Sequence, residues 1–328
     1  VRRSAAHMPD GDIAAVRPGD LILAEVQSMG SHKRGQLSDG RYSALFPRDR
    51  VVLACADRFA EDQFEGLAAL SPGGVDLLAG GGVIGLMQSR NGRVKCPTRL
   101  SVIARLADAD GRVLNLDRFA VEAGQMAAPA RVIGVLGTGM NAGKTAAAAG
   151  LVNGLARYGD KVAALKATGT GSFGDVHLYE AAGALRTLDF TDAGLASTYR
   201  QPVERLDQLT RTLLSAVADC DVAVVELADG VSQVETAALL ARPAYRALFD
   251  AFVLAAPSAL AARGGLAWRA AHDVTPMALT GLMTQAPLAR REAEDLGLPV
   301  LSREDLSDPA TALSLHALWA DASTEHVA

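Results

Sequence analysis

The residues with the clearest chemistry form a glycine-rich loop, Gly137 to Thr145, between an apolar run and an alanine-rich segment. A loop between a strand and a helix points backbone N–H groups into one concavity, where the helix N-terminus attracts phosphate oxygens. We expect Lys144 to reach the β and γ phosphates of a nucleotide and Thr145 to bind Mg²⁺. This loop, called the P-loop below, departs from the nucleotide-binding pattern G-x-x-x-x-G-K-[ST] at Thr138, although Gly137 and Gly139 on either side keep a tight turn feasible. An ordinary glycine-rich loop is the alternative.

All residues of this loop and the first helical residue are predicted nucleotide contacts: Gly137, Thr138, Gly139, Met140, Asn141, Ala142, Gly143, Lys144, Thr145 and Ala146. The base is expected near Thr284, Gln285 and Pro299, late in the chain. Guanine sites of P-loop proteins normally carry N-K-x-D there, and the segment 283–286 has no such aspartate. ATP is therefore the predicted nucleotide.

Acidic residues follow a buried strand at Glu226 and Asp229. A carboxylate at the end of a strand beside a P-loop commonly holds Mg²⁺ or its water shell. Both acids, with Thr145, are the predicted metal ligands. The alternative is that a strand-end acid caps a helix, which the sequence does not distinguish from metal binding. Asp175 is a further candidate for catalysis and Asp192 for substrate binding, and a turn-forming role is the alternative for each.

A second lysine, Lys166, ends the next predicted strand, and the segment continues to Gly171. The carboxyl ends of parallel strands face one crevice, so Lys166 is expected beside the P-loop. These residues resemble the dethiobiotin synthetase family, which carries G-T-D-x-x-x-G-K-T, K-P-x-x-x-G and V-V-E-G-x-G-G. The resemblance implies that Lys166 contacts substrate and the γ phosphate. It also implies a substrate pocket lined by Thr168, Gly169, Thr170 and Gly171.

A second resemblance covers more of the chain, roughly residues 131 to 305. The order of the P-loop, the A-T-G-T-G stretch, the segment 188–194, the V-V-E strand and the late G-L-M-T-Q-A-P segment is similar to a bacterial family of P-loop proteins. That family includes a D-glutamate N-acetyltransferase and usually has a Rossmann-like N-terminal domain. The N-terminal half of this chain has a different pattern, so the acetyltransferase activity is not transferred.

The pattern of expected strands and helices changes near residue 125, which predicts two domains, residues 1–124 and 125–328. The first has short β-rich runs between turn signals and is predicted to be a small β domain, with a barrel as one option. Its expected elements are strands at 20–26, 42–46, 51–54, 83–88, 100–106 and 113–116 and one helix at 60–69. The second alternates strands and helices and is predicted to be an α/β P-loop NTPase domain with a parallel sheet. Its expected strands are 132–136, 162–166, 222–226, 251–255 and 277–283.

Composition restricts the classes of partner. The chain has 328 residues, is 49% hydrophobic and carries a formal net charge of −5, which disfavours nucleic acid as a partner. Its three cysteines match no metal or disulfide spacing, and no apolar run is long enough to cross a membrane. A cytoplasmic protein acting on a small-molecule substrate is expected, and a homodimer is an open option.

Three functions fit these residues. The leading one is MgATP-dependent phosphoryl transfer to a small molecule, or its activation, by a kinase or a ligase. The second is a nucleotide-dependent switch or assembly protein. The third is an N-acetyltransferase that uses the loop to bind the pyrophosphate of acetyl-CoA, because the same anion-binding physics serves either ligand.

Overall fold

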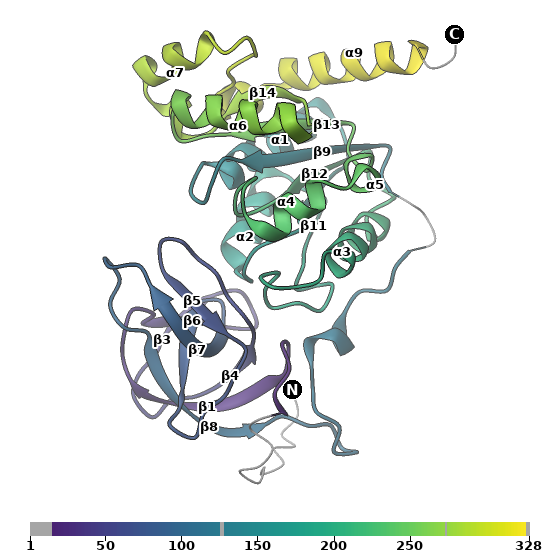
Figure 1. The fold of residues 1–328 in the computed structure, drawn as a ribbon. Coiled ribbons are helices and arrows are strands. Elements are labelled where there is room, and N and C mark those ends of the chain that lie inside the picture. Colours follow the sequence, from purple (N-terminus) through teal and green to yellow (C-terminus); the bar gives the residue numbers. More distant parts are fainter. Residues whose placement is uncertain (1–14, 125–127, 273, 326–328) are drawn as a thin grey trace. The chain divides into compact units, whose positions relative to one another are not determined.

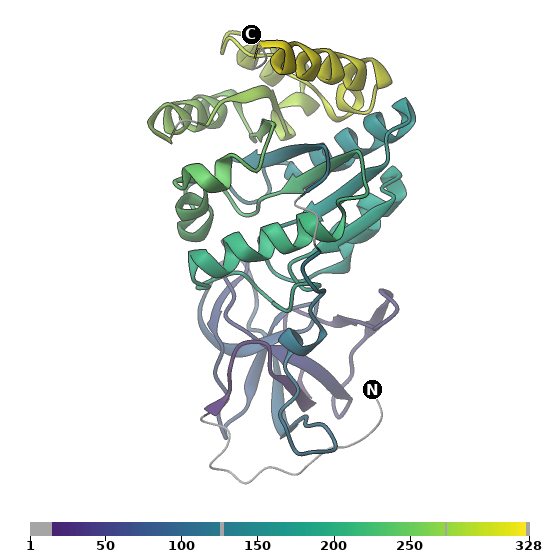
Figure 2. The same ribbon diagram turned by 90° about the vertical axis from the view of Figure 1, so that its right-hand side faces the viewer.

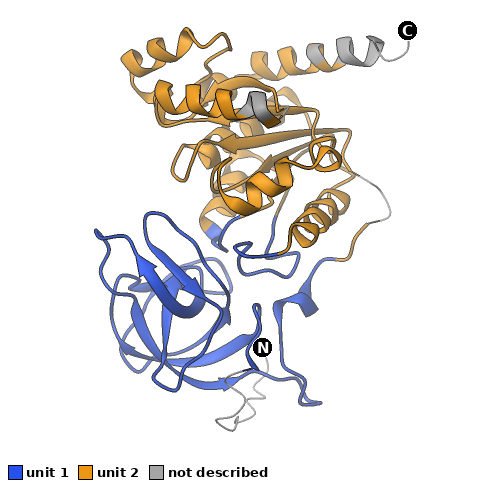
Figure 3. Cartoon of the chain, viewed as in Figure 1, with its two compact units in different colours: residues 1–121, 169–173, 189–201 blue, residues 122–168, 174–188, 202–328 orange. Residues whose placement is uncertain are grey.

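The computed structural model describes residues 15–124, 128–272 and 274–325. The chain forms two compact units, shown in separate colours in Figure 3. The β-rich unit comprises Val1–Val121, Gly169–Phe173 and Asp189–Gln201. The P-loop unit comprises Glu122–Thr168, Gly174–Leu188 and Pro202–Ala328. Two short segments from the second half of the chain thus belong to the β-rich unit, so the units are not contiguous in sequence.

The β-rich unit is built on a six-stranded sheet that closes on itself (Figure 1). The strand order is β4-β1-β8-β6-β7-β5, and an additional pairing joins β4 to β7, so β4, β1, β8, β6 and β7 form a ring. The strands are β1 (Leu21–Ser28), β2 (Arg34–Gln36), β3 (Tyr42–Ala44), β4 (Arg50–Cys55), β5 (Phe64–Leu67), β6 (Val75–Ala79), β7 (Val83–Arg90) and β8 (Thr98–Arg105). The prediction of a small β-rich region is confirmed, and the ring of strands corresponds to the barrel that the sequence left as one option.

Alternation of buried and less buried residues explains these strands. In β1, Ile22, Ala24 and Val26 are fully buried, and the residues between them are partly exposed. A period of two places one set of side chains inside the ring, where they form one apolar cluster with Leu77 and Leu100.

Two predictions in this unit are wrong. The segment 60–69 contains β5 and not a helix, because Phe64 and Gly66 are buried while their neighbours are less so, which is the period of a strand. The segment 113–116 forms only isolated bridges, Ala107 with Val113 and Asp20 with Asn115. It leads into the 3₁₀ helix η2 (Leu116–Phe119), which the Asn115 side chain caps by accepting the N–H of Asp117.

The P-loop unit contains a six-stranded sheet in the order β11-β10-β12-β9-β13-β14. The pairings from β10 through β12, β9 and β13 to β14 are parallel. The strands are β9 (Arg131–Gly137), β10 (Val162–Lys166), β11 (Arg186–Asp189), β12 (Val222–Glu226), β13 (Ala251–Ala255) and β14 (Pro276–Thr280). The predicted α/β fold with a parallel sheet is confirmed.

Helices cover both faces of this sheet, as Figure 2 shows. They are α1 (Lys144–Tyr158), α2 (Phe173–Ala182), α3 (Val203–Ala216), α4 (Val234–Leu240), α5 (Pro243–Arg246), α6 (Ala259–His272), η3 (Leu282–Gln285), α7 (Pro287–Glu294), α8 (Arg303–Leu306) and α9 (Pro309–Glu325). The alanines of α1 let it pack closely on β9, β10 and β12, and nine of its residues are buried. This packing fixes the start of α1 at the carboxyl end of β9.

Within the described ranges, no helix combines the length and the apolar character that crossing a membrane requires.

Candidate functional site

The glycine-rich loop joins β9 directly to α1 in the P-loop unit. Gly143 caps α1 with a φ of 99°, a left-handed conformation that favours glycine. An added Cβ at Gly230, after β12, would lie 2.6 Å from the Cα of Gly139. The loop is therefore pressed against the turn that follows β12, and its backbone donors are held at the N-terminus of α1. This is the strand–loop–helix geometry that holds phosphate groups.

Lys144 lies across this loop and is buried, with 6% of its surface exposed. Its Nζ donates to the carbonyl of Gly139 at 2.9 Å and to the carbonyl of Asp229. These carbonyls hold the ammonium over the mouth of the loop, where a phosphate group would offer stronger, charged acceptors.

Thr145 and Glu226 meet beside the loop, as the sequence predicts. The Thr145 hydroxyl donates to Glu226 Oε1 at 3.3 Å. The other carboxylate oxygen, Oε2, accepts a hydrogen bond from the hydroxyl of Tyr179 on α2. Glu226 is 2% exposed and Tyr179 1% exposed, so the carboxylate is oriented by protein groups and not by water.

Lys166 joins the same cluster from the end of β10. Its Nζ forms an ion pair with Asp175 and lies 3.7 Å from Glu226 Oε1. The parallel pairing of β10 with β12 places Lys166 opposite Glu226 in register. Lys166 and Asp175 therefore stand beside the pair formed by Thr145 and Glu226.

Burial and charge shift the ionisation of this cluster. Burial alone would raise the pKa of Glu226, but Lys166, the Tyr179 hydrogen bond and Lys144 outweigh burial and lower the pKa. Burial lowers the pKa of Lys144 against the attraction of Glu226. Burial and the adjacent Glu226 carboxylate raise the pKa of Tyr179 well above its usual value, so its hydroxyl stays protonated.

The donor set fits a hard divalent cation such as Mg²⁺. A hydroxyl and a carboxylate oxygen lie side by side, and oxygen ligands of this kind suit Mg²⁺. Among the residues that the structure describes, no group of three or more His, Cys, Asp or Glu side chains could hold a metal ion. At nucleotide sites, Mg²⁺ is usually bound by one or two protein groups together with phosphate oxygens and water. The main-chain carbonyl of Asp229 accepts from Lys144. The metal role predicted for its carboxylate stays a prediction.

A second feature beside the start of α1 is a cavity of about 300 Å³. Gly143 and Ala146 line it together with Thr284 and Gln285, two of the residues predicted near the base. Arg303 and Glu304 also line it, whereas Pro299 does not. The cavity thus offers amide, hydroxyl and carboxylate groups beside the start of α1, and a base bound there stays a prediction.

The predicted substrate residues are divided between the two units. Thr168, in the P-loop unit, is buried, and its hydroxyl donates to the carbonyl of Ala228. Gly169, Thr170 and Gly171 belong to the β-rich unit. Asp192 is also in that unit, where its carboxylate accepts the N–H of Asp189 at 2.8 Å, as in a turn.

Three residues at these sites escaped sequence reasoning. Tyr179 is one residue of an ordinary helix, and no spacing rule connects it to Glu226. Arg303 and Glu304 begin α8, where Ser302 and Asp305 form a capping box. That S-x-x-D signal predicts a helix start at this position, but it does not predict a cavity wall.

Comparisons with known proteins give no family for the chain. No family model matches it, and no curated protein matches it. The dethiobiotin synthetase and D-glutamate N-acetyltransferase resemblances therefore stay predictions.

Solved structures similar to the chain include signal recognition particle receptors FtsY. The receptor of Elizabethkingia anophelis with GDP is 19% identical, with a TM-score of 0.39, over 58% of this chain and 63% of the receptor. A second structure of that receptor is 21% identical, with a TM-score of 0.34, over 51% of this chain and 55% of its own. Chloroplast FtsY from Physcomitrella patens is 15% identical, with a TM-score of 0.35, over 58% of this chain and 66% of its own. The chain spans less than two thirds of each receptor.

Likeness at this level assigns neither function nor ligand to this chain. The sheet order, the loop between β9 and α1, and the meeting of Lys144, Thr145 and Glu226 are observations of the chain itself. They identify the P-loop unit as a P-loop NTPase fold.

Proposed function

We propose that the P-loop unit binds a nucleoside triphosphate with Mg²⁺ and cleaves its γ phosphate. The observation that supports this most is the contact of Thr145 Oγ1 with Glu226 Oε1, at 3.3 Å, at the start of α1. Phosphoryl transfer depends on position and on neutralised charge more than on covalent catalysis. Mg²⁺ held at this contact would neutralise charge on the phosphate oxygens. A coenzyme A site has no γ phosphate to neutralise, so the contact favours a triphosphate.

The side chains of the cluster have different proposed roles in phosphate binding and proton transfer. Lys144 exchanges its carbonyl partners for β and γ phosphate oxygens, and the loop amides bind the same groups. Lys166 lies near Glu226 and offers a second positive charge to the transferred group. Asp175, the partner of Lys166, is the proposed acceptor of a proton from the attacking oxygen.

The attacking group is water in a hydrolase or switch protein and a small molecule in a kinase or ligase. We propose ATP as the nucleotide, because the segment 283–286 lacks the aspartate of guanine sites. The Glu304 carboxylate in the cavity could accept from the amino group of either base, so both nucleotides are included in the test.

The test measures release of phosphate and of nucleoside diphosphate from ATP and from GTP, each with Mg²⁺ and with EDTA. We expect Mg²⁺-dependent turnover in the full-length chain and its loss in Lys144→Ala. Lys161→Ala is the matched control, because Lys161 is an exposed lysine of the same unit outside the loop. Equal turnover in both variants would refute the proposal. Diphosphate release without phosphate release, on addition of small acids or amines, would identify a transferase.

A further inference from the structure

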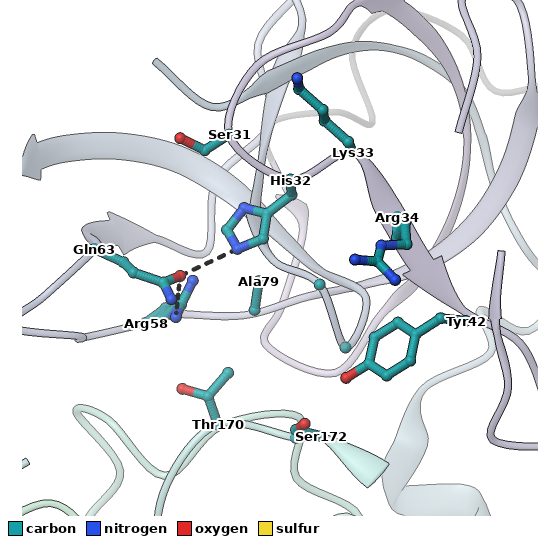
Figure 4. Close-up of a pocket in the computed structure, with 13 residues that line it drawn as sticks. Ser31, His32, Lys33, Arg34, Tyr42, Arg58, Gln63, Ala79, Thr170 and Ser172 are labelled. Carbon is teal, nitrogen blue, oxygen red and sulfur yellow. Dashed lines mark hydrogen bonds between the residues drawn. The ribbon is translucent and has the colours of Figure 1, made fainter. Parts of the chain in front are cut away.

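A separate cavity of about 610 Å³ lies within the β-rich unit. Its volume falls in the range of pockets for small molecules, roughly 300–1,000 Å³. Residues before and on β2 form one wall, and Thr170 and Ser172 lie opposite His32 and Arg58 (Figure 4). The proposed nucleotide site uses none of these residues.

The lining of this cavity is basic. His32, Lys33, Arg34 and Arg58 all contribute to it, and none of its described lining residues is acidic. Arginine and lysine carry a positive charge at neutral pH, which gives the cavity three charges. Burial and the neighbouring Arg58 lower the pKa of His32, so its ring is neutral at pH 7. A guanidinium offers a planar pair of donors that matches a carboxylate or a phosphate.

Arg58 is buried, with 7% exposed, and is oriented before any ligand binds. Its Nη2 donates to Gln63 Oε1 at 3.0 Å, and His32 Nε2 lies 3.1 Å from the same oxygen. The dashed lines in Figure 4 show how Gln63 joins the two side chains. Groups held in this way lose little freedom when a ligand binds.

The loop that carries Ser31, His32, Lys33 and Arg34 is also held in place by hydrogen bonds. The N–H of Gly30 donates to Thr98 Oγ1 at 2.9 Å, and the N–H of Ser31 donates to the carbonyl of Cys96 at 2.9 Å. An added Cβ at Gly30 would lie 2.3 Å from that carbonyl oxygen, so only glycine allows the approach. These contacts attach the loop to the start of β8 and place Lys33 and Arg34 at the cavity.

The wall formed by Thr170 and Ser172 is built by close backbone packing. The N–H of Gly171 donates to the carbonyl of Ala196 at 3.0 Å. An added Cβ at Gly81 would lie 1.9 Å from the Gly171 oxygen, so the two backbones touch. The wall is therefore rigid, and it contributes two hydroxyl groups that can donate to an anion.

We propose that this cavity binds a small molecule that carries at least two negative charges on phosphate or carboxylate groups. Isolated basic loops are usually solvated, but here a buried arginine, a fixed loop and opposing hydroxyls enclose one volume. The proposal goes beyond the nucleotide site and does not depend on nucleotide cleavage.

The test is calorimetric titration of the full chain with pyrophosphate and, separately, with citrate. We expect a dissociation constant below about 1 mM for at least one of them, since 1 mM is the weak end of specific binding. Arg34→Gln should weaken binding about tenfold, as expected for loss of one charged hydrogen bond. Arg41→Gln is the matched control. It removes an equal charge outside the cavity, since Arg41 is exposed and pairs with Asp39. Binding of pyrophosphate alone would identify a phosphate ligand, and binding of citrate alone a carboxylate.

The P-loop could bind pyrophosphate as well, so Lys144→Ala separates the two sites. Binding that persists in Lys144→Ala and weakens in Arg34→Gln supports the cavity. Binding that is lost in Lys144→Ala and unchanged in Arg34→Gln assigns the anion to the P-loop and overturns the proposal. The absence of heat with both anions at millimolar concentration also overturns it. Arg58→Lys is a second variant that keeps the charge and removes the planar fork, and equal binding in it would contradict the role of Arg58.

Discussion

The hydroxyl of Tyr179 provides a quantitative test of the site, because its removal leaves the aromatic ring in place. In Tyr179→Phe, the Glu226 carboxylate loses a hydrogen bond, and water cannot replace it at 1% and 2% exposure. A hydrogen bond to a charged group contributes about 1.5–3 kcal/mol. We therefore expect the free energy of unfolding of the P-loop unit to fall by about 2 kcal/mol. Glu226 keeps its contacts with Thr145 and Lys166, so the fold should persist.

Tyr245 is the matched control in the same unit. It is fully buried, and its hydroxyl lies 3.1 Å from the Thr210 hydroxyl. Thr210 already donates to the carbonyl of Leu206, so Tyr245 donates to Thr210, which is a neutral acceptor. A neutral hydrogen bond contributes about 1 kcal/mol. Tyr245→Phe should therefore lower the free energy of unfolding by about half as much as Tyr179→Phe.

The assay is urea unfolding followed by tryptophan fluorescence. The chain has two tryptophans, Trp268 on α6 and Trp319 on α9, and both belong to the P-loop unit. The signal therefore reports unfolding of the unit that contains both tyrosines, and the midpoints give the difference in stability at equal slope. An equal loss in the two variants, or a larger loss in Tyr245→Phe, would refute the charged hydrogen bond to Glu226.

Three further results are expected. Gly230→Ala should weaken nucleotide binding at least about tenfold, since its Cβ would lie 2.6 Å from the backbone of the P-loop, and small displacements at such sites are costly. Titration calorimetry tests this against Gly264→Ala, where no described residue beyond its own helix lies within 4 Å of the added Cβ. The pKa of Glu226 is lower in the folded protein than its unfolded value near 4.5. The charged carboxylate therefore stabilises the fold above the unfolded pKa, and this stability is lost as the pH falls through the folded pKa. Unfolding measured from pH 7 to pH 3 should thus show a smaller acid loss in Glu226→Gln, and equal loss would contradict the assignment. Burial raises the pKa of Cys55 to about 12, whereas Cys96 is exposed, so iodoacetamide at pH 8 should modify only Cys96 of these two. Mass spectrometry of the native protein would detect labelling of Cys55, which would contradict its burial.

The sequence predicted the central strands well because their signal is local. The bounds of β10, β12 and β13 agree with the prediction, since each is a continuous apolar run that ends at a charged or small residue. The edge strand β11 was missed, because R-T-L-D has no such run. The helix predicted at 60–69 fails for a similar reason. Five of its ten residues are apolar but they form no long run, and the tertiary contacts of Phe64 and Gly66 decide between the two periods.

The site could be predicted in part. The P-loop, Glu226 and Lys166 follow from motifs at strand ends, where topology alone brings residues together. The partners that orient them do not follow, because Tyr179 reaches Glu226 through the packing of a helix on the sheet. The sequence also does not predict that the basic residues line one cavity, because the walls of this cavity are distant in sequence. Only the runs from Ser31 to Arg34, from Ala79 to Gly81 and from Thr170 to Ser172 are adjacent along the chain.

The divided β-rich unit has a consequence for synthesis of the protein. The chain leaves or enters this unit after residues 121, 168, 173, 188 and 201. Ala196, from the last of its segments, is buried in one cluster with Phe64 and Leu78. When residues 15–121 leave the ribosome, they therefore lack part of their own core, and the unit is complete only when Gln201 has emerged. By then β9, α1 and β10 have already been made. The β-rich unit therefore completes its core only after part of the P-loop unit has been made, and a nascent chain held at residue 121 is expected to expose apolar surface to chaperones.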